Sequence, residues 1–522
     1  MAYAEKKSNN VYLIYTLQKS AWIKLQPKPQ DSGLFLLKRS KQKLYFCEHN
    51  LNLMKVEQLY TGCLAQGAYY IESNGEAAVI DPLRETSPYL ERAKRDGATI
   101  KYVFETHFHA DFVSGHLTLA KKTNAPIIFG PNANPNFEAL IATDGQEFKL
   151  GEATIVALHT PGHTMESTTY LLRDANGKDH AVFTGDTLFL GDVGRPDLAQ
   201  KGKELTQEQL AGTLYDSLRN KIMPLADDVI VYPAHGAGSA CGKNMMKETI
   251  DTLGNQKKMN YALRADMDKE TFIKEVTDGL VPPPDYFPLN VKMNKEGYAD
   301  LDAVIEMGKR ALSPDAFEIA ANATGAVVLD VRHHNDFSAG HIPRSIFIGL
   351  DGGFAPWVGT LIADVKQPIL LVADENRVEE AVTRLSRVGF DNTIGYLAGG
   401  FERWQKAPKE VDTLTSVSAT TLKADLKKGD IPVFDVRKPS EFGSEHIPVA
   451  ENTPLDFINR HLAEFPANKP FYVHCAGGYR SVIAASILKS RGIHNVIDVA
   501  GGFKAIKEAE IAVSDYVYPS TL

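Results

Sequence analysis

The chain has 522 residues, and at about 100–200 residues per domain this length predicts three or four domains. Hydrophobic residues make up 43% and charged residues 23% of the chain, which is typical of a globular protein that folds in water. The net charge of −8, without a basic stripe that carries aromatic residues, argues against a nucleic-acid partner. No apolar run approaches the roughly 18 residues of a membrane span, and the four cysteines do not make a disulfide framework. We therefore expect a cytoplasmic protein with no membrane partner.

Residues 1–53 show neither the apolar core nor the small-residue cleavage site of a signal peptide. Two interpretations are open. Either this segment is a real N-terminal extension, or an upstream start codon has been chosen wrongly and the protein begins at Met54.

Residues 54–285 alternate between strand-like and helix-like patterns, which predicts one mixed α/β domain. Helices are predicted over residues 88–95, 207–219 and 244–263. The prolines at 282–284 then end the pattern and predict a semi-rigid connector. Strands are predicted at residues 77–80, 102–105, 126–129, 154–158, 169–172, 181–183 and 229–232.

Potential metal ligands follow four of these predicted strands. The first strand end carries the stretch 106–112 (THFHADF), in which side-chain alternation aims two histidines the same way. Imidazole and carboxylate together suit zinc or iron better than calcium or magnesium. Four such strand ends on one rim predict a metal site, and the residues concerned are His107, His109, Asp111, His163, Asp186 and His235.

The order of these motifs resembles that of the metallo-β-lactamase superfamily, which implies a sandwich of two sheets between helices (αββα). Dinuclear hydrolases of that superfamily have a histidine directly after the motif aspartate, where this chain has Phe112. An apolar ring cannot bind a metal, so a second metal site would lack one ligand. The resemblance begins at Met54, and for this reason we favour the interpretation that the start codon of residues 1–53 is assigned wrongly.

The remaining set of His107, His163 and Asp186 resembles the ligands of non-haem Fe(II) oxygenases. It also resembles the persulfide dioxygenases of the superfamily, which oxidise glutathione persulfide to sulfite at one iron. This resemblance implies one Fe(II) per chain. It also implies that His109, Asp111 and His235 hydrogen-bond water or ligands beside the metal.

Two further residues of this domain have two interpretations each. Arg195, in the stretch 194–197 (GRPD), is expected to bind a carboxylate of the substrate, and the alternative is a structural ion pair with Asp197. Cys241 lies in the stretch 234–242 (AHGAGSACG), which resembles the last signature of the persulfide dioxygenases. It is either a redox-sensitive thiol near the iron or a buried structural cysteine.

The second half of the chain contains an internal repeat. The triplet DVR at 330–332 recurs at 435–437, HIP at 341–343 recurs at 446–448, and AGGF at 398–401 recurs at 500–503. These near-constant offsets predict a duplicated module of about 100 residues, built on a mainly parallel sheet. The pattern resembles rhodanese domains, which are sulfurtransferases. The expected domains are 54–299 for the metal domain, 300–410 for the first repeat and 411–522 for the second.

The two repeats differ where rhodanese chemistry takes place. In the second repeat, Cys475 follows a strand and precedes a helical stretch, a setting that favours thiolate and sulfur transfer. Arg480 is expected to attract thiosulfate or a persulfide. In the first repeat Asp374 replaces the cysteine, so this copy is expected to be catalytically silent, with a structural or docking role.

The whole architecture resembles persulfide dioxygenase–rhodanese fusions of hydrogen sulfide metabolism. The expected substrates are a low-molecular-weight thiol persulfide (glutathione persulfide or similar) and O2. Thiosulfate or sulfite is the expected partner of the rhodanese reaction, whose direction the sequence leaves open. The alternative is a dinuclear zinc thioester hydrolase resembling glyoxalase II with a sulfur-carrying rhodanese tail. A homo-oligomer is one of the oligomeric states left open.

Overall fold

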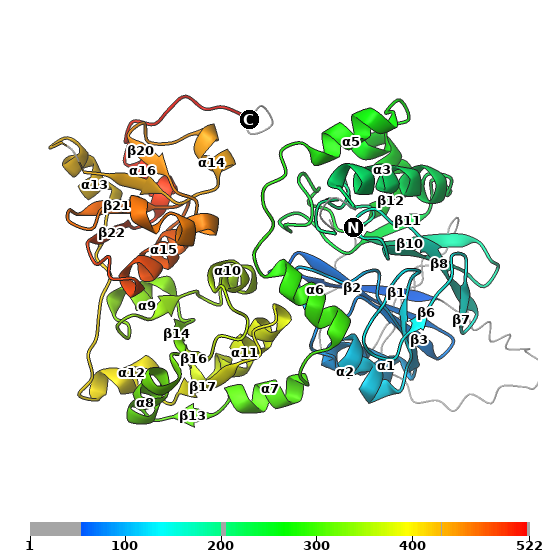
Figure 1. Ribbon diagram of the computed structural model, residues 1–522, viewed down its shortest axis with the longest axis horizontal. Helices are drawn as coiled ribbons and strands as arrows, with labels where there is room; N and C mark the ends of the chain where they lie inside the picture. The colour runs from blue at the N-terminus through cyan, green and yellow to red at the C-terminus, as the bar shows by residue number, and fades with distance from the viewer. Residues whose placement is uncertain (1–53, 200–204, 430, 519–522) are drawn as a thin grey trace, which may run out of the picture. The chain divides into compact units, whose positions relative to one another are not determined.

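The computed structural model describes residues 54–199, 205–429 and 431–518. The interpretations of residues 1–53 lie outside this part of the chain. The expected α/β fold class is confirmed: two six-stranded sheets are followed by two five-stranded sheets (Figure 1). Among the described residues, no helix has the length and apolar character needed to cross a bilayer.

The two six-stranded sheets lie in the metal domain, and their strands run in sequence order across each sheet. The strands of the first sheet are β1 (Lys55–Thr61), β2 (Gln66–Ser73), β3 (Glu76–Ile80), β4 (Thr99–Phe104), β5 (Ile127–Phe129) and β6 (Leu140–Ile141). Those of the second sheet are β7 (Glu147–Leu150), β8 (Ala153–His159), β9 (Thr168–Arg173), β10 (Asp179–Gly185), β11 (Ile230–Pro233) and β12 (Asp251–Thr252).

The layers of this domain follow from the two-residue alternation of its strands. Tyr69 and Ile71 of β2 belong to a core shared by both sheets, whereas Ala68 and Tyr70 belong to a core shared with helices. The second sheet likewise contributes alternate residues to the core between the sheets, and its outer face packs against three other helices. The first sheet is covered by α1 (Ser87–Asp96) and α2 (His116–Thr123), and the second by α3 (Gln207–Ser217), α4 (Leu253–Met259) and α5 (Lys269–Thr277). The result is the expected αββα sandwich.

The helix predicted over residues 244–263 is wrong in its first half. The backbone N–H groups of Lys243 and Asn244 donate to Asp192 Oδ2, and Met246 N donates to Leu190 O. These bonds tie the segment to the loop after β10, so it forms irregular structure and then β12 before α4 begins at Leu253. Apolar periodicity alone could not reveal this tertiary competition.

Each repeat contains a five-stranded parallel sheet, and both sheets have the same strand order. Two helices, α6 (Phe287–Glu296) and α7 (Leu301–Gly308), precede the first sheet. Its elements are β13 (Ala311–Leu312), α8 (Pro314–Thr324), β14 (Val327–Asp330), α9 (His334–Ala339), β15 (Ile346–Phe347), α10 (Phe354–Leu361), β16 (Ile369–Val372), α11 (Val378–Arg387), β17 (Thr393–Leu397) and α12 (Gly400–Lys406). The second repeat contains β18 (Ser416–Val417), α13 (Ala419–Leu426), β19 (Val433–Asp435), α14 (Pro439–Ser444), β20 (Ala450–Asn452), β21 (Phe471–His474), α15 (Tyr479–Ser490), β22 (Val496–Val499) and α16 (Gly502–Glu508).

The repeated sequence motifs make the same internal contacts in both copies. The arginine of DVR pairs with the aspartate of the same triplet, and its guanidinium lies over the phenylalanine of AGGF at 4.3 Å in the first copy and 3.8 Å in the second. These motifs therefore hold the strand ends together, which explains why they persist in a copy without the cysteine. The residues are Asp330, Arg332 and Phe401 in the first copy and Asp435, Arg437 and Phe503 in the second.

Candidate functional site

The histidines and aspartates singled out in the metal domain meet where the strands of its two sheets end. His107 follows β4 of the first sheet, while His163, Asp186 and His235 follow β8, β10 and β11 of the second. All four side chains are buried. Two sheets that face each other thus supply one cluster from opposite sides.

Three of these side chains converge on one point. His107, His163 and Asp186 each offer a ligand atom, and these atoms lie within 4.8 Å of one another. The Nε2 atoms of His163 and His107 lie 3.5 and 3.9 Å from Asp186 Oδ2. Such separations leave room for an ion between the three atoms, each at the usual distance of about 2 Å from it.

The hydrogen bonds behind the two imidazoles set their tautomers. The Thr106 hydroxyl donates its proton to Asp81 Oδ2 at 2.9 Å, so it accepts from His107 Nδ1–H at 3.0 Å. His163 Nδ1–H donates to the Arg195 carbonyl at 2.9 Å. Both rings therefore keep the Nε2 lone pair free toward Asp186, which is the form that binds a metal. Burial, together with neighbouring histidines, also holds the pKa of His107 well below its usual value.

Gly194 allows this arrangement because its backbone approaches the site closely. A Cβ atom at this position would lie 2.0 Å from the Asp186 carbonyl oxygen and 2.9 Å from His163 Nδ1. Any side chain here would displace the loop that accepts the His163 hydrogen bond.

A second group lies beside the first. His109, Asp111 and His235 also offer ligand atoms within 4.8 Å of one another. His235 Nε2 lies 3.5 Å from Asp111 Oδ1 and 3.6 Å from Asp186 Oδ1. Burial alone would lower the pKa of His235, but the Asp111 and Asp186 carboxylates outweigh it and raise this pKa well above the usual value.

Phe112 occupies the edge of this second group. Its ring is fully buried and lies 4.3 Å from the His109 ring. The His109 Nε2 atom is 3.1 Å from Asp81 Oδ1 and 3.5 Å from Glu105 Oε2. Two carboxylates therefore lie beside one edge of the His109 ring without a hydrogen bond to it, and the apolar Phe112 ring packs against it at an interplanar angle of 34°.

Several buried polar atoms of the cluster have no hydrogen-bond partner in the part of the chain that the structure describes. They are both oxygens of Asp186, both ring nitrogens of His109 and of His235, and Oδ1 of Asp111. Each such atom costs about 1–3 kcal/mol when nothing satisfies it, and native proteins leave few of them. A concentration of carboxylate and imidazole lone pairs at one point fits a bound transition-metal ion.

The contacts of Arg195 favour the structural interpretation. Its guanidinium is 4% exposed and makes two bonds of 2.7 Å to the Asp197 carboxylate. It also donates to the carbonyls of Ala240 and Val281 at 3.2 and 2.6 Å. These bonds tie together the loop after β10, the loop after β11 and the segment that leads to the prolines.

Arg195→Lys is therefore expected to lower the melting temperature while the Michaelis constant for a thiol persulfide, the substrate expected from the sequence, stays unchanged. A lysine cannot reproduce the two-pronged contact with Asp197, and each lost bond to a charged group costs about 1.5–3 kcal/mol. Arg173→Lys is the matched control, because Arg173 pairs with Asp179 at a partly exposed position. A raised Michaelis constant at an unchanged melting temperature would instead assign substrate binding to Arg195.

Cys241 is a buried cysteine beside the candidate metal ligands, and its redox sensitivity stays a prediction. Its side chain is 1% exposed, and it forms a third group of ligand atoms with Asp186 and His235. Burial and the nearby carboxylates of Asp111 and Asp186 raise its pKa to about 12. The thiol thus lies at the candidate metal centre and is shielded from solvent.

Three residues at this site escaped the sequence analysis. Asp81 directly follows β3 and accepts hydrogen bonds from the backbone and hydroxyl of Thr106. Glu105 lies behind His109, and Asn294 of α6 hydrogen-bonds the loop that carries His109. Asp81 follows a predicted strand, as the candidate ligands do, and this position is a signal by which the sequence could have identified it. The sequence around Asn294 carries no motif that would mark this residue as part of the site.

The second candidate site is the Cys475 loop between β21 and α15. The Cys475 side chain is 1% exposed, and Gly478 N–H donates to its sulfur at 3.1 Å. α15 begins at the next residue, so the sulfur faces the N-terminus of a twelve-residue helix, where the helix dipole favours an anion. Gly502 of the AGGF motif packs against this loop, since a Cβ there would lie 2.4 Å from the Cys475 carbonyl oxygen.

The Arg480 guanidinium forms an ion pair with a carboxylate. It makes bonds of 2.6 and 2.8 Å to Glu441 of α14. The pair spans the first turn of α15 and the segment after β19. Arg480 as a substrate-binding residue stays a prediction.

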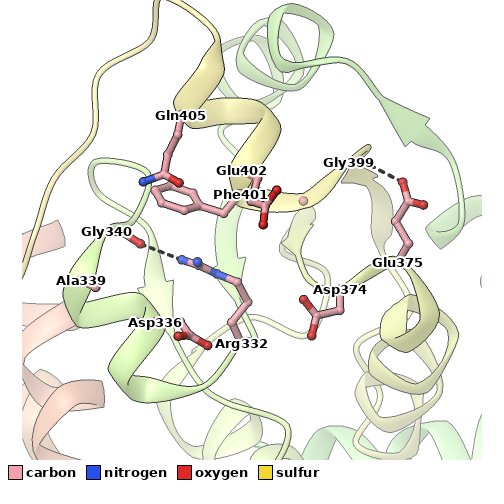
Figure 2. A pocket seen from close by; sticks show the side chains of 11 residues that line it. Arg332, Asp336, Ala339, Gly340, Asp374, Glu375, Gly399, Phe401, Glu402 and Gln405 are labelled. Carbon is pink, nitrogen blue, oxygen red and sulfur yellow. Dashed lines mark hydrogen bonds between the residues drawn. The ribbon is translucent and has the colours of Figure 1, made fainter.

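The corresponding place in the first repeat is an acidic cavity of about 650 Å³ (Figure 2). Asp374 stands in the position of Cys475, and Arg377 turns away to pair with Glu380 and Asp351. Arg332 is the one arginine labelled in Figure 2, and it is committed to Asp330 and the Gly340 carbonyl. The carboxylates of Asp336, Asp374, Glu375 and Glu402 line the cavity. An anionic sulfur donor would be repelled here.

Comparison with known proteins agrees with this geometry. The family model of the metallo-β-lactamase superfamily matches residues 61–235, and that of the rhodanese-like domain matches residues 313–407 and 418–509. These matches fall inside the ranges 54–299, 300–410 and 411–522, whose boundaries stay a prediction.

Individual relatives divide between two activities. The human persulfide dioxygenase ETHE1, a mitochondrial protein, is 28% identical over 225 residues, which cover 42% of this chain and 78% of the relative. A cytoplasmic hydroxyacylglutathione hydrolase of Arabidopsis thaliana is 33% identical over 178 residues, which cover 33% of this chain and 65% of the relative. The chain thus spans about two thirds of the length of that hydrolase.

A solved metallo-β-lactamase from Staphylococcus aureus subsp. aureus COL shares 31% identity and a TM-score of 0.58 with this chain. The match covers 66% of this chain and 98% of the other. The resemblances predicted from the sequence are confirmed, and membership of this fold family indicates that the chain binds metal, while the assignment of the ligand residues stays a prediction. The chain belongs to the metallo-β-lactamase superfamily, and two rhodanese-like domains follow its metal domain.

Proposed function

We propose that the metal domain is a persulfide dioxygenase that uses one Fe(II), held by His107, His163 and Asp186. The observation that carries the proposal is the convergence of two free Nε2 lone pairs on Asp186 Oδ2, beside a buried Phe112 in place of a second-metal ligand. Two imidazoles and one carboxylate are the protein ligands of non-haem Fe(II) oxygenases. The similarity to the human persulfide dioxygenase supports the same activity.

The reaction that this assignment implies is balanced without a further reductant. A thiol persulfide, O2 and water give the thiol, sulfite and two protons. The outer sulfur loses four electrons, and O2 gains four. Bound Fe(II) supplies coordination positions and redox chemistry for both substrates.

The surrounding side chains prepare the site for this chemistry. The Thr106 hydroxyl and the Arg195 carbonyl fix the ring orientation of the two histidine ligands. His235, whose pKa is raised by the carboxylates despite its burial, can hold or release a proton beside Asp186. The buried rings of Phe112 and Phe189, the latter 6.1 Å from His235, limit access of water.

The second repeat acts in this proposal as a sulfurtransferase coupled to the dioxygenase. The Cys475 thiolate attacks the outer sulfur of a persulfide and releases the thiol, which gives a cysteine persulfide. Sulfite then attacks the outer sulfur of that persulfide, so thiosulfate leaves and the thiolate is restored. The Gly478 N–H and the start of α15 stabilise the negative charge on sulfur at each stage. We favour this direction over the reverse because sulfite is reactive and toxic.

A second candidate function is a dinuclear zinc hydrolase that cleaves a glutathione thioester. The group formed by His109, Asp111 and His235 favours it, because these atoms could hold a second ion next to Asp186. The similarity to the Arabidopsis hydroxyacylglutathione hydrolase points in the same direction. Phe112 argues against it, since the usual histidine ligand is missing.

Metal analysis separates the two candidates. Protein that has been stripped and then equilibrated with excess Fe(II) or excess Zn(II) is expected to retain one ion per chain. Phe112→His restores the missing donor and is expected to retain two zinc ions. Two zinc ions per wild-type chain, together with thioester hydrolysis, would overturn the dioxygenase proposal in favour of the hydrolase.

A further inference from the structure

The loop of residues 109–114, which carries His109 and Asp111, is held by one side chain of α6. The Asn294 amide donates to the carbonyls of His109 and Phe112, and its oxygen accepts from Ser114 N–H. All three bonds are 2.8 Å long, and the side chain is 1% exposed. Asn294 lies between the residues matched by the two family models.

The same loop is also bonded to the silent first repeat. Val113 N–H donates to the carbonyl of Arg387, the last residue of α11, at 2.7 Å. Gly389, which follows α11 with a φ of +85°, lies against both Val113 and Asn290 of α6. Phe112 and Phe287 belong to one continuous hydrophobic cluster with Leu385 and Val388 of this repeat.

A second loop of the metal domain is anchored at the same helix end. Arg84 is fully buried and makes two bonds of 2.9 Å to the Asp391 carboxylate and one to the Ser386 carbonyl. Its neighbour Glu85 forms an ion pair with Arg387. This loop begins at Asp81, which binds Thr106 and thereby orients the His107 ring.

We infer that α6 and the C-terminal end of α11 are structural parts of the metal centre, so that the silent repeat serves to hold the loops beside the metal ligands. Both loops are bonded to residues 386–391, and Asn294 bonds the carbonyl of His109 from α6. The silent repeat needs no cysteine for this role. The inference rests on the proposed metal binding and extends it to residues far from the metal ligands in sequence.

The first test compares two asparagines on one face of α6. Asn294→Ala removes three hydrogen bonds to the loop and is expected to weaken metal binding by about 10–100-fold, as other groups behind metal ligands do. Asn290 is the matched control: it is fully buried one turn earlier and lies against Gly389, but its amide has no hydrogen-bond partner within the described chain, so the comparison isolates the three bonds of Asn294. Asn290→Ala is expected to leave the metal affinity unchanged. Affinity is read with Co(II) or Zn(II) alone, in competition with a chelator.

The second test works from the silent repeat and remains valid if Asn294→Ala does not fold. Asp391→Asn removes the charge that pairs with Arg84. Because Asp391 is partly exposed, the protein is expected to fold, and its metal affinity is expected to fall as in Asn294→Ala. Glu379→Gln on α11 is the control, since Glu379 pairs with Lys309 at the surface. Asn294→Asp keeps the acceptor for Ser114 N–H but places a carboxylate oxygen against the carbonyls of His109 and Phe112, so it is expected to lower the affinity at least as far as Asn294→Ala.

Wild-type metal affinity in both Asn294→Ala and Asp391→Asn would overturn the inference. A fall in melting temperature without a fall in affinity would reduce these contacts to ordinary domain packing, which also contradicts it. The measurement needs no substrate. A protein that binds metal but consumes no O2 would thus contradict the proposed function while these variants still decide the inference.

Discussion

Replacing His107 by alanine is expected to give a folded protein that holds no iron and takes up no O2 with a thiol persulfide. The His107 ring provides one of the Nε2 lone pairs that face Asp186 Oδ2, and an alanine leaves only His163 and Asp186. The ring is buried among the polar side chains at the strand ends and not among the apolar side chains that join the two sheets, so the sandwich is expected to be retained. Iron content by elemental analysis and O2 uptake at an electrode check both parts of this prediction.

His180→Ala is the matched control for this variant. His180 lies on β10, the strand that leads to Asp186, but its side chain is exposed. The His180→Ala variant is expected to keep full iron content and full O2 uptake. Retained iron and full O2 uptake in His107→Ala would remove His107 from the metal site and with it the ligand assignment.

The second large effect is expected from Cys475→Ser. Sulfur transfer should be abolished, because a serine hydroxyl cannot carry a sulfane sulfur, whereas O2 uptake with persulfide stays nearly intact. The product should then shift from thiosulfate to sulfite, which ion chromatography measures directly. The two chemistries separate in this way because Cys475 and the candidate metal ligands belong to different domains of the chain.

Asp374→Asn is the control for the sulfur-transfer prediction. Asp374 takes the position of Cys475 in the silent repeat and lines its acidic cavity (Figure 2). Its substitution is expected to change neither product. Unchanged thiosulfate output from Cys475→Ser would exclude the relay through this cysteine, and a collapse of its O2 uptake would show that the two sites are not independent.

Much of the architecture could be predicted because it depends on local patterns. The strands predicted at residues 77–80, 102–105, 154–158 and 229–232 are present as β3, β4, β8 and β11, whereas β2 is not predicted because residues 68–71 are all apolar and show no alternation. The repeated triplets identified the duplication, and the structure explains them by the contact of Arg437 with Asp435 and Phe503. His107, His163 and Asp186 were singled out because each follows a predicted strand, and the structure brings them together, although their role as metal ligands stays a proposal.

What could not be predicted depends on contacts between distant segments. The expected helix over residues 244–263 fails in its first half because Asp192 binds the backbone N–H groups at 243 and 244. The ion pair of Arg195 with Asp197 is one of the two interpretations that the sequence offers, but the bonds of Arg195 to the carbonyls of Ala240 and Val281 join distant segments and have no local signal. Asn294 and Asp391 have no local signature, because what they bind lies about 180 and 300 residues away in the chain.

The most direct test of the proposed dioxygenase is the stoichiometry of O2 consumption by the iron-loaded protein with glutathione persulfide. We expect that one O2 is consumed for each persulfide oxidised and that zinc-loaded protein is inactive. Sulfite is expected to accumulate in the Cys475→Ser variant. Thioester hydrolysis by the zinc-loaded protein, with no O2 consumed by the iron-loaded form on any low-molecular-weight persulfide, would contradict this proposal.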